Sequence, residues 1–132
     1  MEIEKKLKSG EILKILDTDF ETSNALFKAV IKSLKSIDID DSVKNLEAFT
    51  GALIGAQLSD DSVEKAMWGC LACCLYKGAK IVPSVFNDFK AREDFIEICL
   101  EVGQENLRPF MNGLYVGLPR ITQMIANIQR PK

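Results

Sequence analysis

The chain has 132 residues, which is near the commonest size of a single domain and large enough to bury a hydrophobic core. Its hydrophobic fraction of 47% and charged fraction of 27% are those of a globular protein and argue against extensive disorder. The net charge of −2 lacks the strongly basic balance of general nucleic-acid binders. No apolar run approaches the roughly 20 residues of a membrane span, and four cysteines without a secretory segment fit a reducing compartment. We therefore expect a cytoplasmic protein that binds neither nucleic acid nor membrane.

The charges are unevenly spread. Between residues 37 and 64 seven acids accompany one base, whereas no acid follows Glu105 and four bases do. An asymmetry of this kind can orient partners or copies of the chain toward one another. Chance on a solvated surface explains it equally well, and both interpretations stay open.

The first predicted element, at residues 2–16, is ambiguous. Ile3, Leu7 and the apolar residues at 12–16 suit helical spacing, but "KSGE" at 8–11 could equally turn a short hairpin of two charged strands. After it, Thr18 and Glu21 resemble a capping box and predict a helix that ends near Ser36. Its apolar stripe has i, i+3, i+4, i+7 spacing and consists of Phe27, Val30, Ile31 and Leu34.

Four further helices follow in the predicted order. A second helix is expected from roughly Ser42 to Leu58, and a third from "SDDS" at 59–62 to about Tyr76. A fourth runs from about Ala91 to Asn106; Pro109 interrupts the pattern, and Pro119 opens a short final helix at 119–129. The expected fold is a single domain over 1–132, mainly α: a compact bundle of about five helices with its helical core at 18–118.

The four cysteines are the first candidates for chemistry. Cys70 and Cys73 form a CxxC next to Cys74, but a structural zinc site needs four ligands and Cys99 is a single candidate for the fourth. The chain has no histidine, which removes the commonest general base and His metal ligands. Because the pair is predicted late in a helix, where the dipole disfavours a thiolate, we interpret the cysteines as core residues. A small thiol-redox protein using Cys70 and Cys73 is the alternative; no catalytic residue, metal or cofactor is predicted.

A ladder of glutamates is predicted on the fourth helix. Its members are four residues apart, so they share one face: Glu93, Glu97, Glu101 and Glu105. A di-iron site would need Glu-x-x-His, which a chain without histidine cannot supply. The ladder is therefore either a solvated face or an electrostatic surface for a cationic partner.

Four segments carry a resemblance to a known family. They are the start of the third helix, the turn-rich "YKGAKIVPSVF", the start of the fourth helix and its end: Ser62, Val63, Glu64, Ala66, Trp68, Cys70; Tyr76, Gly78, Lys80, Ile81, Pro83, Phe86; Ala91, Arg92, Asp94, Phe95; Glu101, Val102, Asn106, Leu107, Pro109, Phe110. The pattern resembles the tail assembly chaperones of long-tailed bacteriophages and prophages. The opening also resembles that family's charged hairpin followed by a helix, which favours a hairpin at 2–16.

The resemblance implies a non-catalytic function. Such proteins coat the long, apolar-rich tape-measure protein, help recruit tail-tube subunits in the host cytoplasm, and are absent from the finished virion. Several copies would act along one substrate, so self-association is expected. The alternative from another class of binding protein is a generic helical adaptor.

A holding chaperone needs an exposed apolar surface of modest affinity. The best candidates lie in "RPFMNGLYVGL" and in the stripe of the final helix: Phe110, Met111, Leu114, Tyr115, Ile121, Met124, Ile125 and Ile128. Closure of the core is the alternative role for both segments.

Overall fold

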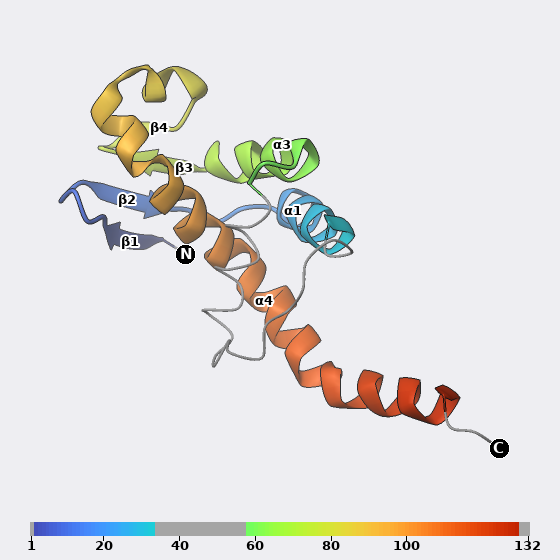
Figure 1. Cartoon of the computed structure of the whole chain (residues 1–132). Coiled ribbons are helices and arrows are strands. Elements are labelled where there is room, and N and C mark those ends of the chain that lie inside the picture. Colours follow the sequence, from blue (N-terminus) through green and yellow to red (C-terminus); the bar gives the residue numbers. More distant parts are fainter. Residues whose placement is uncertain (1, 34–57, 130–132) are drawn as a thin grey trace.

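The computed structural model describes residues 2–33 and 58–129, and the side chains of 114–129 lie outside that description. Within these ranges a four-stranded sheet packs with three α-helices and one short 3₁₀ helix, η2. Figure 1 shows the long helix α4 passing the sheet, α1 and α3 before it continues to the C-terminus. The elements, in chain order, are β1 (Ile3–Lys6), β2 (Ile12–Ile15), α1 (Phe20–Ser33), α3 (Asp61–Leu71), β3 (Cys74–Tyr76), β4 (Ala79–Lys80), η2 (Pro83–Asn87) and α4 (Phe89–Gln129).

The N-terminal residues form the hairpin rather than a helix. β1 and β2 pair antiparallel with Ile3 opposite Ile15 and Lys5 opposite Leu13. Gly10 closes the turn with a φ of 95°, a conformation that glycine adopts without steric cost, and its N–H donates to the Leu7 carbonyl at 2.9 Å. The hairpin favoured by the family resemblance is confirmed.

A second hairpin, which the helical prediction missed, follows α3. β3 pairs with β2 and with β4, so the sheet has the order β1-β2-β3-β4. Lys77 and Gly78 join β3 to β4 with φ values of 55° and 81°. Positive φ at both central residues is the signature of a type I′ turn, whose twist matches that of the flanking strands. The prediction that the third helix reaches Tyr76 is therefore wrong: α3 ends at Leu71, and the residues after it form a strand.

The first helix begins as predicted but is capped differently. The Asp19 carboxylate accepts the N–H of Thr22 at 2.8 Å, so Asp19 is the N-cap of α1. The pKa of Asp19 is lowered because the Thr22 side chain and backbone N–H both bond to its carboxylate. The Thr18 hydroxyl, predicted to cap the helix, is buried and has no hydrogen-bond partner among the described residues. The capping box on Thr18 and Glu21 is thus not formed.

The two helices predicted after residue 90 are one. α4 runs over 41 residues from Phe89 to Gln129. It passes through Pro109, which was expected to interrupt it, and through Pro119, which was expected to open a separate helix. Proline in a helix removes one hydrogen bond and usually bends the axis, and Figure 1 shows α4 changing direction in its C-terminal third. Pro109 has no N–H to donate to the backbone carbonyl one helical turn before it. Because Pro109 is exposed, water can bond that carbonyl instead. The expected helix at 42–58 lies almost wholly outside the described residues. The fold is mainly α with an N-terminal hairpin, but it is not a bundle of about five helices.

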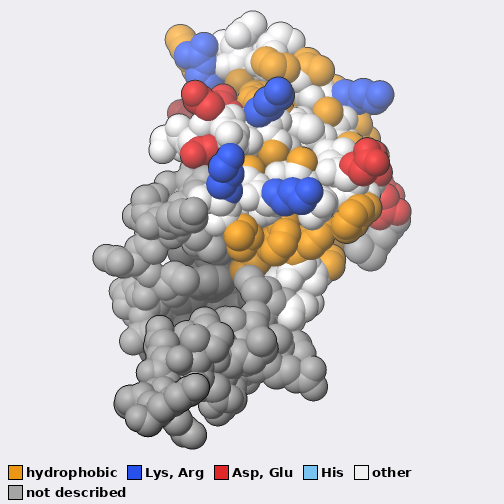
Figure 2. Space-filling model, turned by 90° about the vertical axis from the view of Figure 1, so that its right-hand side faces the viewer, with side chains coloured by type: hydrophobic (Ala, Val, Ile, Leu, Met, Phe, Trp, Pro, Cys, Tyr) orange, Lys and Arg blue, Asp and Glu red, His pale blue; other side chains and the backbone are white. Residues whose placement is uncertain are grey.

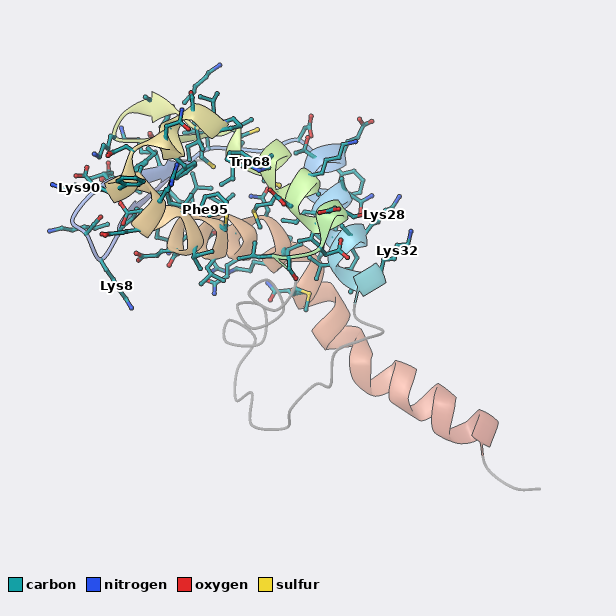
Figure 3. All side chains as sticks on the ribbon, turned by 45° about the horizontal axis from the view of Figure 1, so that its top comes forward. Lys8, Lys28, Lys32, Trp68, Lys90 and Phe95 are labelled. Carbon is teal, nitrogen blue, oxygen red and sulfur yellow. The ribbon has the colours of Figure 1, made fainter. Side chains whose placement is uncertain are left out.

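The core lies between the sheet, α1, α3 and α4. Its fully buried side chains come from all of them: Leu13, Leu26, Val30, Val63, Met67, Leu71, Ile81, Ile98, Val102, Leu107 and Met111. An aromatic cluster closes the end near η2, where Phe86 packs edge-on against Phe95 at 4.9 Å between ring centroids. Figure 3 shows Trp68 of α3 close to Phe95 of α4, and their ring centroids are 5.8 Å apart. These contacts hold the first half of α4 firmly against the sheet and α3.

Candidate partner-binding groove

A stack of three phenylalanines joins α1 to the middle of α4. The Phe110 ring lies 4.8 Å from Phe27 and 5.8 Å from Phe20, measured between ring centroids. Phe27 and Phe110 are half-buried, whereas Phe20 is 68% exposed. Phe20 directly follows the N-cap Asp19, so the helix start fixes its position above Phe110. A large ring held exposed on an ordered support is a feature of contact surfaces.

Beside this stack lies an open groove of about 360 Å³, which we call the aromatic groove. The hairpin, the start of α1 and the middle of α4 form its walls. Its lining is mostly apolar: Ile3, Ile15, Leu16, Asp17, Thr18, Phe20, Ser23, Glu105, Asn106, Pro109 and Phe110.

Two of the polar residues in this lining, Ser23 and Asn106, are bonded to each other. The Ser23 hydroxyl donates to the Asn106 side-chain oxygen at 2.7 Å, and the Asn106 amide donates to the Val102 carbonyl at 2.9 Å. Both residues are buried, so this pair satisfies groups that would otherwise be costly to bury. It also ties α1 to α4 at the base of the groove. The walls of the groove are therefore fixed relative to each other.

The predicted partner-binding residues divide into three groups. Phe110 lies at the aromatic groove, and Met111 is 2% exposed and belongs to the core. The other six lie on the part of α4 whose side chains are not described: Leu114, Tyr115, Ile121, Met124, Ile125 and Ile128. Phe20 and Leu16 were missed, because no helical periodicity marks residues at a strand-to-helix junction. The one available signal was a large apolar residue directly after a capping aspartate.

The face shown in Figure 2 carries a band of hydrophobic side chains along the border with the residues that are not described. Basic side chains lie on the other side of this band. Lys28 and Lys32, one turn apart on α1, project outward in Figure 3. Three further exposed apolar residues lie just before α4 or in its first turns: Val82, Phe89 and Ile96. Phe89 is 76% exposed. About 20 residues of helix, or roughly 30 Å, separate Phe89 from Phe110.

The glutamate ladder faces the N-terminal hairpin. The backbone N–H of Lys8 donates to both carboxylate oxygens of Glu97, at 3.2 and 3.3 Å. Lys5 Nζ lies 3.7 Å from Glu101 Oε2 and 3.8 Å from Glu105 Oε1. Arg108 adds a second cation, 3.1 Å from the Glu105 carboxylate. Three rungs of the ladder are thus engaged within the chain, and the positive charges relieve their mutual repulsion.

The cysteines are free thiols, and three of them are buried. Burial raises the pKa of Cys70 to about 12, that of Cys74 to about 11 and that of Cys99 to about 12. Cys74 is on β3 instead of the predicted helix, yet it still faces the core. A redox centre needs a thiol that ionises near neutral pH, so this environment disfavours the thiol-redox alternative. Within the described ranges no group of three or more Cys, Asp or Glu is placed to hold a metal ion.

These features define a small protein built around one long helix, with an open apolar groove on a rigid support. None of its described helices is both long and apolar enough to cross a membrane. The chain belongs to the phage tail assembly chaperone family: the family model, described as phage tail assembly chaperone protein (TAC), matches residues 17–115. A search of curated proteins and a search of solved structures gave no match. The general role of the chain is accordingly that of a chaperone in phage tail assembly.

Proposed function

We propose that this chain is a non-catalytic holding chaperone that binds the tape-measure protein in the host cytoplasm and helps recruit tail-tube subunits around it. The proposed contact surface is the aromatic groove together with the C-terminal part of α4. The observation that carries this proposal is the Phe20 ring, which is 68% exposed and yet stacked on Phe110 at the groove. An apolar stretch of a helical partner would cover this ring and remove it from water.

The size of the groove suits reversible binding. A volume of about 360 Å³ holds a few apolar side chains, not a whole helix. Burying a Phe-sized side chain contributes about 2 to 3 kcal/mol, so one groove supplies a modest affinity. Several copies along one long partner would add up to a strong total interaction. Each copy can still leave when a tube subunit replaces it.

The proposed contact surface continues beyond the groove along one face of α4. Counting from Phe110, the positions at 114, 121, 125 and 128 are spaced by 4, 7, 4 and 3 residues, which keeps them on a single face of a helix. The segment 114–129 adds about 24 Å of helix beyond the groove. A helical partner could therefore contact this face over several turns.

Co-expression with the tape-measure protein tests the proposal. We expect the wild-type chain to keep that protein in the soluble fraction and to co-purify with it. Phe20→Ala should reduce the recovered complex about tenfold or more, because it removes the exposed ring without emptying the core. Phe89→Ala is the matched control, since it removes an equally exposed phenylalanine at the far end of α4.

The extension is tested separately by Ile121→Glu and Ile125→Glu, which place charges on the proposed contact face. Both should weaken co-purification while circular dichroism shows the folded chain. Equal loss of binding for Phe20→Ala and Phe89→Ala would contradict the assignment of the groove. A folded wild-type chain that neither binds nor solubilises the tape-measure protein would contradict the function itself. Retention of purified tail-tube protein on the chaperone–tape-measure complex tests the recruitment step.

A further inference from the structure

Among residues 2–33 and 58–129, β1 is an edge strand, and none of these residues bonds its outer side. The sheet order β1-β2-β3-β4 gives it a neighbour only in β2, and Figure 1 shows it at the border of the sheet. The N–H of Leu7 donates to the Glu11 carbonyl at 2.9 Å. Every second residue of an antiparallel strand bonds the same neighbour, so Lys5 and Ile3 are the next residues of β1 that bond β2. The backbone groups of Glu4 and Lys6 therefore point away from the sheet, free to bond another strand.

The side chains on this edge carry opposite charges two residues apart. Glu4 and Lys6 are both exposed, and neither has an ion pair or hydrogen bond with the described residues. Edge strands that avoid pairing are often short or carry charged side chains, especially lysine. Here the signs alternate, so an antiparallel copy of the same strand can meet opposite charges.

We propose that two copies of this chain pair through β1 in a two-fold antiparallel arrangement that joins their sheets. Two antiparallel β1 strands can bond through their outward backbone groups in several registers. In one of these registers, Glu4 of each copy lies opposite Lys6 of the other copy. Both are hydrogen-bonded pairs, and opposite charges directly across strands stabilise such a pair. Shifting the register by one step in either direction places Glu4 on Glu4 or Lys6 on Lys6. The charges therefore select one register, and a two-fold axis makes the contact self-complementary.

The inner side of this joint accommodates the remaining residues. Lys5 lies on the two-fold axis opposite Lys5 of the second copy, but each ammonium is already beside Glu101 and Glu105 of its own chain. The four carboxylates compensate the two cations. Adjacent strands are about 4.8 Å apart, so the two β2 strands lie about 14 Å from each other.

Charge reversal tests the pairing by sedimentation equilibrium. The wild-type chain should show a concentration-dependent monomer–dimer equilibrium, because an interface centred on one short strand is small. Lys6→Glu and Glu4→Lys each turn both charge pairs into like-charge pairs and should raise the dimer dissociation constant about tenfold or more. The double variant Glu4→Lys/Lys6→Glu restores opposite charges and should restore the dimer. A mixture of the two single variants should form a heterodimer.

A cysteine crosslink tests the register. Opposed residues in a non-hydrogen-bonded pair have Cα atoms about 4.5 Å apart, within disulfide range. In a Cys73→Ser background, Lys5→Cys should give a disulfide-linked dimer on mild oxidation, and Lys8→Cys, on the exposed turn, should not. A monomeric wild-type chain, or a dimer that none of the charge variants affects, would overturn the proposal. Glu4 and Lys6 do not line the aromatic groove, so these outcomes are distinguishable from failure of partner binding.

Discussion

The hydroxyl of Tyr76 on β3 donates a hydrogen bond of 2.5 Å to Oδ2 of Asp94 on α4. The same carboxylate oxygen accepts the Ser9 hydroxyl from the β1–β2 turn at 2.9 Å. Asp94 is only 4% exposed, so these two donors replace the water that a carboxylate would otherwise bind. Burial and this bond both raise the pKa of Tyr76 far above its ordinary value of 10.0. One buried carboxylate thus ties both hairpins of the sheet to the long helix.

Tyr76→Phe should lower the free energy of unfolding by about 2 kcal/mol. The change keeps the ring and removes one of the two donors to a buried carboxylate, and hydrogen bonds to charged groups contribute about 1.5 to 3 kcal/mol. Ser9→Ala, at the part-buried turn, should cost less. Urea denaturation measures both values. A Tyr76→Phe chain as stable as the wild type would show that the bond contributes nothing to folding.

Thr18→Val should raise the free energy of unfolding by about 1 kcal/mol. It removes a buried hydroxyl that has no hydrogen-bond partner in the described part of the chain, and it keeps the shape of the side chain. Asp19→Ala should destabilise the chain, because it deletes the cap of α1. Thermal unfolding of both variants beside the wild type separates the two roles. If Thr18→Val lowered the stability more than Asp19→Ala, Thr18 would be the cap of α1.

The residues at 2–16 left helix and hairpin open, and the family resemblance favoured the hairpin. The starts of α1 and α3 could be predicted, because capping residues are local signals, although α1 is capped by Asp19 and not by Thr18. The end of α3 could not. Cys70 and Cys74 fit a helical period of i, i+4, whereas Cys74 and Tyr76 fit a strand period of i, i+2, and only pairing with β2 decides between them. The lysine–glycine pair at 77–78 was the overlooked local signal for a hairpin.

The course of α4 and the groove depended on tertiary contacts. Pro109 is a valid stop signal in an isolated segment, but packing of α4 against α1, α3 and the sheet outweighs the loss of one hydrogen bond there. Phe110 was predicted as a surface residue because of its apolar neighbourhood. Its partner Phe20 lies 90 residues earlier, and no periodic pattern connects the two. The partners of the glutamate ladder were hidden in the same way, since the hairpin that meets it is remote in sequence.

Thiol alkylation should separate Cys73 from the other cysteines. In the native chain at neutral to mildly alkaline pH, Cys73 alone should react readily, because Cys70, Cys74 and Cys99 are buried and have raised pKa values. All four should react after addition of denaturant. Mass spectrometry of the labelled peptides identifies each site. Rapid native labelling of Cys70 would favour the thiol-redox function instead.

Stability should fall as the pH rises above about 9. The thiols of the unfolded chain ionise near their ordinary pKa of 9.0, while burial keeps Cys70 and Cys99 protonated up to a pKa of about 12. In this window the folded state holds more protons than the unfolded state, so each of the two lowers the free energy of unfolding by about 1.4 kcal/mol per pH unit. Urea denaturation at several pH values measures the slope. Cys99→Ala should make this pH dependence shallower, whatever the substitution does to stability at pH 7. An unchanged slope would show that Cys99 ionises alike in the folded and unfolded states.

The contacts that fasten the β1–β2 turn to α4 also set an order of events during synthesis. Ser9 bonds Asp94 across 85 residues of sequence, and Lys8 bonds Glu97 across 89. The turn leaves the ribosome first, but its anchor emerges only when most of the chain has been made. Two-stranded hairpins are marginally stable alone, and distant pairings slow folding because the intervening loop must close first. The nascent chain therefore completes its fold late, after α4 has emerged, and until then the β1 edge and the rings at the aromatic groove are exposed to other chains.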